Sequence, residues 1–128
     1  MSLCMYKEGG SKKYILLEPY RDTIPFIQED NIHTEWCSLW SDGVIHIDQG
    51  YEWDGASGPT IDTDNTMDGA LVHDVLYQLM REEWLSINYR KAADQCIRQM
   101  CIADGMSVIR AYYWYLALRV GGGSSARG

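Results

Sequence analysis

Hydrophobic positions recur with a strand period in the first fifty residues of this chain and with a helix period after residue 66. Residues 13–18 form a short β-type run that ends at Pro19, because proline cannot donate to a strand ladder. Residues 32–40 alternate like one half-buried strand, and residues 44–48 are typical of a returning strand after a glycine-containing turn. The first part of the chain therefore predicts a small antiparallel β-meander.

Three helices are predicted after a turn-rich segment that begins at Gly50. The first runs from about residue 67 to 80 and is apolar on more than one side, so we expect it to be largely buried with His73 within one apolar face. The second spans roughly residues 87–104. The third, residues 108–120, is apolar almost all round, as helices are that are buried or cover a partner.

These elements predict an α+β fold in one domain of residues 1–121. A Gly-rich loop would join the β-meander to a three-helix part that contains an antiparallel helix pair. Residues 122–128 are predicted to be a flexible Gly/Ser tail.

Charge narrows the classes of partner. The chain has 128 residues with 11 Lys and Arg against 18 Asp and Glu, a net charge of −7, which opposes binding to a nucleic-acid backbone. An anionic membrane is also disfavoured unless a divalent cation bridges the two surfaces. The chain opens without a signal-peptide pattern and contains no apolar run long enough to span a bilayer, so we expect a soluble protein made in the cytosol.

The four cysteines predict no disulfide framework. Cys96 and Cys101 lie five residues apart on a predicted helix, which turns them about 140° from each other. Cys4 and Cys37 complete no zinc-binding spacing with them. We expect reduced and buried thiols.

The candidate metal-binding and catalytic residues lie between Asp54 and Asp94. Small residues at 54–59 allow backbone carbonyls to converge, and His73 and Asp74 follow on the first predicted helix. Carbonyls and a carboxylate suit a hard cation, and a histidine beside them can activate water. The alternative is an ordinary polar loop that leads into a capped helix.

His73 needs a partner for each ring nitrogen, and Asp94 on the second helix is the candidate. If the first helix ends near Arg81 and Ser86 caps the second, an antiparallel pair brings His73 and Asp94 level. If the first helix instead runs through Trp84, the two residues miss each other by about two turns. The sequence leaves both positions of the turn open.

Residues 50–59, His73 to Tyr77 and Arg90 to Asp94 together resemble the uncharacterised phage and bacterial family named domain of unknown function 1353. The segment from Arg110 to Gly121 matches this family as well, so the resemblance covers about residues 44–121. It implies a phage or prophage product of unassigned activity, placed in the host cytoplasm or the virion.

A more distant resemblance concerns chemistry. The order of a Gly-rich loop, His73-Asp74 with Tyr77, and then Asp94 is similar to that of secreted phospholipase A2 enzymes. The resemblance implies that His73 is the general base on water, oriented by Asp94 and joined in the catalytic group by Tyr77. Tyr77 is alternatively a phenol of the core.

The same resemblance implies a calcium site that polarises an ester carbonyl. Asp74 would bind the ion, and the Asp54 loop would complete its shell with carbonyls near Trp53, Gly55 and Ser57. The chain departs from these enzymes because it lacks their half-cystine framework and any secretion signal.

The leading hypothesis is therefore a phage-type hydrolase that uses a divalent cation, most simply calcium, on a lipid or other ester. The second is a non-enzymatic phage accessory or structural protein in which His73, Asp74 and Asp94 pin two helices together and the aromatic third helix binds a protein partner. A zinc hydrolase ranks third, because His73 and Asp74 supply too few nitrogen or sulfur ligands.

Overall fold

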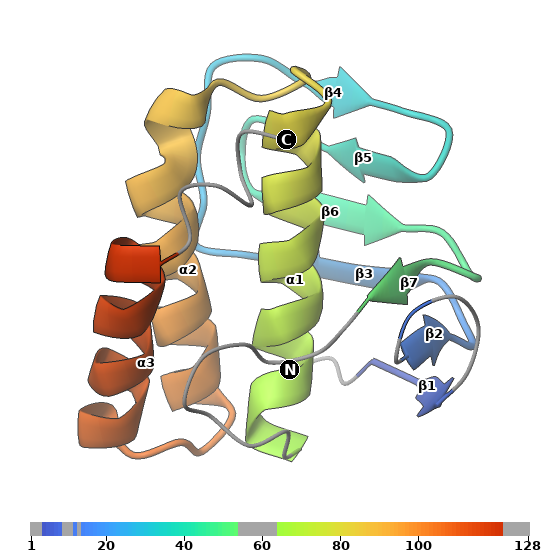
Figure 1. Ribbon diagram of the computed structural model, residues 1–128. Helices are drawn as coiled ribbons and strands as arrows, with labels where there is room; N and C mark the ends of the chain where they lie inside the picture. Colours follow the sequence, from blue (N-terminus) through green and yellow to red (C-terminus); the bar gives the residue numbers. More distant parts are fainter. Residues whose placement is uncertain (1–3, 9–11, 13, 54–63, 122–128) are drawn as a thin grey trace.

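The helices of the protein lie together on one side of its strands, as the computed structural model shows for residues 4–8, 12, 14–53 and 64–121 (Figure 1). The strands come first and the helices follow, which confirms the predicted α+β class. The Gly-rich loop and the Gly/Ser tail, residues 54–63 and 122–128, lie outside the described residues.

Two antiparallel sheets take the place of a single meander in the described part of the chain. One sheet has the order β1 (Tyr6–Glu8), β2 (Tyr14–Leu16), β7 (Glu52–Trp53), and the other has the order β3 (Tyr20–Thr23), β6 (Val44–Ile47), β5 (Cys37–Leu39), β4 (Ile32–His33). In β2, β5 and β6, buried side chains alternate with partly buried ones, so each sheet turns one face towards the core.

The prediction of one strand over residues 32–40 was wrong, because the chain reverses at Thr34. The side-chain oxygen of Thr34 accepts hydrogen bonds from the backbone N–H groups of Trp36 and Cys37 at 3.3 and 3.0 Å. A threonine that bonds to nearby backbone groups favours a turn over an extended strand. The result is the hairpin of β4 and β5, in which Ile32 lies opposite Leu39.

The predicted turn before β6 is present and requires glycine. Gly43 has a φ of 98°, and a Cβ atom there would lie 2.5 Å from the carbonyl oxygen of Ile24. This close approach holds the segment after β3 against the turn, where the N–H of Ile24 donates to the carbonyl of Gly43.

The helical part contains α1 (Asp64–Arg81), a 3-10 turn η1 (Ile87–Tyr89), α2 (Arg90–Ala103) and α3 (Val108–Gly121). α1 and α2 form the predicted antiparallel pair. They pack closely at Gly69, where a Cβ atom would lie 3.0 Å from both Cys101 and Ile97. α3 packs on α2 through Ala111, Trp114 and Leu118, which belong to a second apolar cluster.

The turn between α1 and α2 falls at the first of the two expected positions. The N–H of Trp84 donates to the carbonyl of Leu79, and the N–H of Glu83 donates to that of Met80. These two bonds are the Schellman arrangement that ends a helix. Ser86 then accepts a hydrogen bond from the N–H of Asn88 and starts the next helical segment.

All four cysteines are free and buried, as predicted. Burial raises the pKa of the Cys37, Cys96 and Cys101 thiols to about 12, so these side chains act as small hydrophobic residues. Among the described residues, no helix combines the length and the apolar character that crossing a membrane requires.

Candidate functional site

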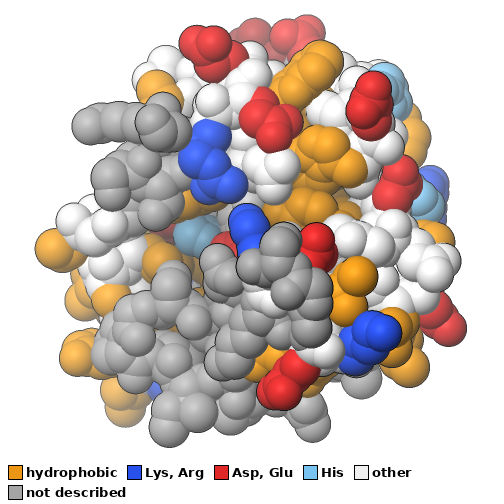
Figure 2. All heavy atoms as spheres, turned by 45° about the vertical axis from the view of Figure 1, so that its right-hand side comes forward, with side chains coloured by type: hydrophobic (Ala, Val, Ile, Leu, Met, Phe, Trp, Pro, Cys, Tyr) orange, Lys and Arg blue, Asp and Glu red, His pale blue; other side chains and the backbone are white. Residues whose placement is uncertain are grey.

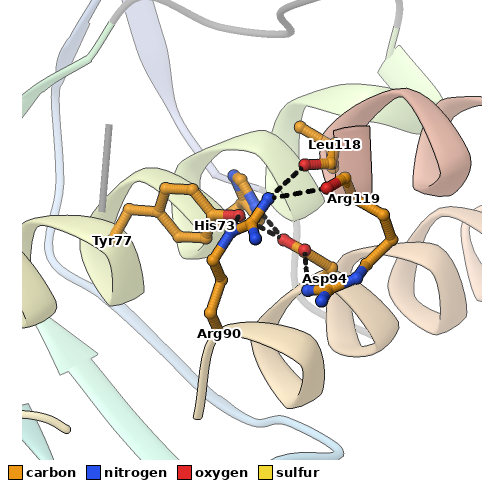
Figure 3. Close-up of polar contacts among 6 residues, drawn as sticks. All are labelled: His73, Tyr77, Arg90, Asp94, Leu118 and Arg119. Atoms are coloured by element: carbon orange, nitrogen blue, oxygen red, sulfur yellow. Dashed lines mark hydrogen bonds and ion pairs between the residues drawn. The ribbon is translucent and has the colours of Figure 1, made fainter. Parts of the chain in front are cut away.

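His73, Tyr77 and Asp94 meet in the interface of α1 and α2 (Figure 3). His73 and Tyr77 are four residues apart and therefore share one face of α1. The Oδ1 atom of Asp94 lies 2.8 Å from Nε2 of His73 and accepts a 2.6 Å hydrogen bond from the hydroxyl of Tyr77. The predicted contact between His73 and Asp94 is thus present.

Arg119 brings α3 into the same cluster. Its Nη1 atom donates to Oδ2 of Asp94 over 2.9 Å, so both oxygens of this carboxylate have donors. The Asp94 side chain is 0% exposed and that of Arg119 is 31% exposed. The ion pair therefore reaches from the interior of the helix pair to the surface at the end of α3.

Arg90 ties the first turn of α2 to α3. Its Nε atom donates to the hydroxyl of Tyr77 over 3.2 Å. Its Nη2 atom donates to the carbonyls of Leu118 and Arg119 over 2.7 and 3.0 Å. The last carbonyls of a helix have no partner within the helix, so Arg90 satisfies two of them and places a cation at the negative end of the helix dipole.

The pKa values in this polar cluster follow from burial and from these bonds. Burial alone would raise the pKa of Asp94, but hydrogen bonds from His73, Tyr77 and Arg119 outweigh it and hold the pKa below its ordinary value. Burial, followed by the bond to Asp94, raises the pKa of the Tyr77 phenol. Asp94 is therefore an anion and Tyr77 a hydroxyl donor at neutral pH.

This bonding pattern assigns the protons on His73. An ionised Asp94 can only accept, so Nε2 of His73 carries the hydrogen that it donates. In the neutral imidazole, Nδ1 then holds the lone pair and is the atom that can take up a proton. The ring is buried, since His73 is 6% exposed.

The remaining predicted site residues divide into two groups. Asp74 is partly buried and lies about 100° around α1 from His73, while Trp53 is fully buried on β7. Asp54, Gly55 and Ser57 lie outside the described residues. Within the described ranges, no three His, Cys, Asp or Glu side chains come close enough together to hold a metal ion.

The sequence did not lead us to place Arg90 or Arg119 in the site with His73. It suggested Arg90 only as a salt-bridge partner of Asp74. Arg90 precedes Asp94 by four residues, a spacing that places both on one face of α2 and that could have drawn attention to it. Arg119 gives no such signal, because its contact depends on how α3 lies against the helix pair.

Fold and site together define a small α+β protein in which a buried carboxylate joins three helices through a histidine, a tyrosine and an arginine. No family model matches the chain, and no curated protein or solved structure is significantly similar to it.

Proposed function

We propose that the protein is a small hydrolase of phage type, acting on a lipid or other ester with His73 as the general base. The observation that carries the proposal is the bond from His73 Nε2 to a buried, ionised Asp94, which leaves Nδ1 as the basic atom. Tyr77 donates to the same Asp94 oxygen and fixes the direction of the carboxylate. The resemblance to phospholipase A2 implies the same three residues.

In this reaction Nδ1 of His73 removes a proton from water, and the resulting hydroxide attacks the ester carbonyl. The carbon–oxygen bond to the alcohol breaks, and the alcohol leaves with the proton that His73 returns. Asp94 holds the ring in one tautomer and one orientation throughout. Tyr77 and Arg119 are positioning residues, because they act through Asp94.

A divalent cation, most simply calcium, would supply charge to polarise the ester carbonyl. Asp74 is the described residue that would hold it, and the loop carbonyls expected beside it belong to residues 53–57. One carboxylate among the described residues is too little for a calcium site, so the proposal requires that loop. We expect calorimetric titration to detect calcium binding that Asp74→Asn abolishes.

Replacing His73 with glutamine separates catalysis from structure. The glutamine amide can still donate to Asp94, but it cannot take up a proton from water. We expect His73→Gln to fold with an unchanged circular dichroism spectrum and to lose ester hydrolysis, measured with calcium and a phospholipid or nitrophenyl ester. His46→Gln is the matched control, since His46 lies on β6 with an Asp48 contact at 3.4 Å. A wild-type protein that hydrolyses no ester, or a fully active His73→Gln protein, would refute the proposal.

A second function is favoured by the outer surface of α3, and we propose it as the alternative. Six large apolar residues of this helix are exposed, from 47% at Leu116 to 90% at Val120. They fall on one side of the helix, opposite the side that packs on α2: Val108, Ile109, Tyr112, Tyr113, Leu116, Val120. Exposed apolar patches that include tyrosines are typical of protein interfaces.

In this alternative the protein is a non-enzymatic accessory or structural protein. The cluster around Asp94 holds α3 in place, and the exposed side of α3 binds a protein partner. Sedimentation of the purified protein tests whether a second copy is that partner. We expect Ile109→Lys with Tyr113→Lys to abolish the association without a change in fold. A wild-type protein that stays monomeric at all accessible concentrations would exclude a second copy.

A further inference from the structure

A cavity of about 480 Å³ lies between the β4–β5 hairpin and the C-terminal end of α1. Figure 1 places these elements side by side at one end of the molecule. Figure 2 shows hydrophobic side chains at the surface there, with acidic side chains around them. The residues that line the cavity are His33, Thr34, Glu35, Trp36, Glu82 and Trp84. It has no residue in common with the His73 cluster.

Two tryptophans contribute aromatic surface to this cavity. Trp36 stacks on Tyr51, with ring centroids 5.1 Å apart and planes inclined by 17°. Trp84 is 53% exposed and lies three residues after the end of α1. Because an indole gains much by burial, a half-exposed tryptophan on the wall of a cavity indicates a surface that a ligand can cover.

The charge of the cavity is negative. Among the described residues that line it, Glu35 and Glu82 are acidic and none is lysine or arginine. Glu82 is held in place, since its Oε2 atom accepts from Nε2 of Gln78 at 2.8 Å. Gln78 in turn accepts from the hydroxyl of Tyr51 at 3.0 Å. Tyr51, whose ring stacks on Trp36, is thus linked to the Glu82 carboxylate through Gln78 by two hydrogen bonds.

The backbone beside the cavity is strained. Glu83 has a φ of 64°, in the left-handed region that glycine normally occupies at the end of a helix. This conformation sets the direction of the chain between Glu82 and Trp84. Left-handed residues other than glycine cluster at functional sites, where the surrounding structure must maintain them.

We propose that this cavity binds a small organic cation, of the alkylated ammonium class. The faces of Trp36 and Trp84 attract such a cation through their π electrons, and Glu35 and Glu82 balance its charge. The net charge of −7 on the chain raises the local concentration of cations. The cavity is large enough for a trimethylammonium group and its substituent. The proposal is independent of the hydrolase proposal, since it uses none of its residues.

The test is a titration with choline that follows the indole N–H resonances of Trp36 and Trp84 by NMR. We expect saturable shifts with a dissociation constant in the millimolar range, as befits so small a ligand. The uncharged isostere 3,3-dimethylbutanol should bind at least about tenfold more weakly, because it lacks the cationic charge. A matching response to both probes would overturn the proposal.

Variants locate the site. We expect Trp84→Ala and Glu82→Gln each to weaken choline binding by about tenfold, and these exposed residues can be replaced without loss of the fold. Glu18→Gln removes the same charge from an exposed position that does not line the cavity, and it should bind as wild type does. Choline binding that persists in both cavity variants would place the cation elsewhere and refute the assignment.

The same variants identify the source of the cation. Phosphatidylcholine vesicles that bind the wild type, but not Trp84→Ala, would show that a lipid headgroup supplies it. Binding of free choline without vesicle binding would show a soluble ligand. Both results support the site, whereas vesicle binding that Trp84→Ala leaves unchanged would contradict it.

Discussion

Replacing Asp94 with asparagine tests whether this carboxylate holds the three helices together. The side chain has no exposed surface and accepts hydrogen bonds from His73, Tyr77 and Arg119. Asparagine keeps the shape but offers one accepting oxygen, so its amide nitrogen must face a donor in either orientation. Breaking a buried ion pair by changing one partner costs about 3 to 5 kcal/mol. We expect the free energy of unfolding to fall by about 3 kcal/mol, since part of the bonding survives.

The loss should depend on pH in a defined direction. The pKa of Asp94 is lowered in the folded protein relative to 3.8. Its contribution is therefore fully present above about pH 4 and disappears as the pH falls through the lowered folded value. Urea unfolding followed by circular dichroism at neutral pH and in acid measures this. The difference between wild type and Asp94→Asn should shrink in acid.

Asp48→Asn is the matched control for this experiment, because the Asp48 side chain is 53% exposed. We expect it to change the free energy of unfolding by less than about 0.5 kcal/mol. A loss below about 1 kcal/mol for Asp94→Asn would show that the cluster does not hold the helices. A difference that stays constant down to acid pH would contradict the assignment of a lowered pKa.

Three further predictions concern other parts of the fold. Glu83→Gly should raise the free energy of unfolding by about 0.5 to 1 kcal/mol in urea titrations, because glycine adopts a left-handed φ without strain. Gly43→Ala should lower it by about 3 kcal/mol, since its Cβ atom would lie 2.5 Å from a backbone oxygen. Burial and the charges of Asp68 and Asp22 raise the pKa of Asp104 to about 6, so Asp104→Asn should stabilise the protein at neutral pH. That gain should shrink as the pH falls through about 6 and vanish below 3.8, where Asp104 is protonated in both states.

The helical part of the fold could be predicted closely because apolar periodicity is a local property. Observed α1, α2 and α3 lie within a few residues of the predicted helices. The turn after α1 could not be placed, because its left-handed position holds Glu83 and not the glycine that usually marks a helix end.

The strands were harder to predict from the sequence, because a single side-chain hydrogen bond can decide where a strand ends. Thr34 splits a well-alternating segment into two short strands by accepting from the backbone. β1 and β7 both pair with β2, although they lie far apart in the sequence. No local pattern shows that residues 6–8 and 52–53 flank the same strand.

For the candidate site, the sequence could yield the members that lie on α1 and α2 but not the member on α3. His73, Tyr77 and Asp94 follow from helix spacing and from the length of the connecting turn. Arg119 reaches Asp94 from the last turn of a third helix, whose place against the pair is set by packing around Trp114 and Leu118. Such a contact depends on tertiary structure alone.

The bonding of Asp94 shows why a structural and a chemical function of this cluster are compatible. Both oxygens of the carboxylate already accept hydrogen bonds, so Asp94 has its orientation fixed and serves to fix that of His73. Arg119 pairs with Asp94 directly and Arg90 is linked to it through the Tyr77 hydroxyl, so these charged side chains together carry one positive charge while the imidazole is neutral. A proton taken up by His73 adds to that charge, and an anionic substrate or an oxyanion would offset it. In the proposed hydrolase, the same bonds that hold three helices together would therefore favour a substrate that carries or develops negative charge beside His73.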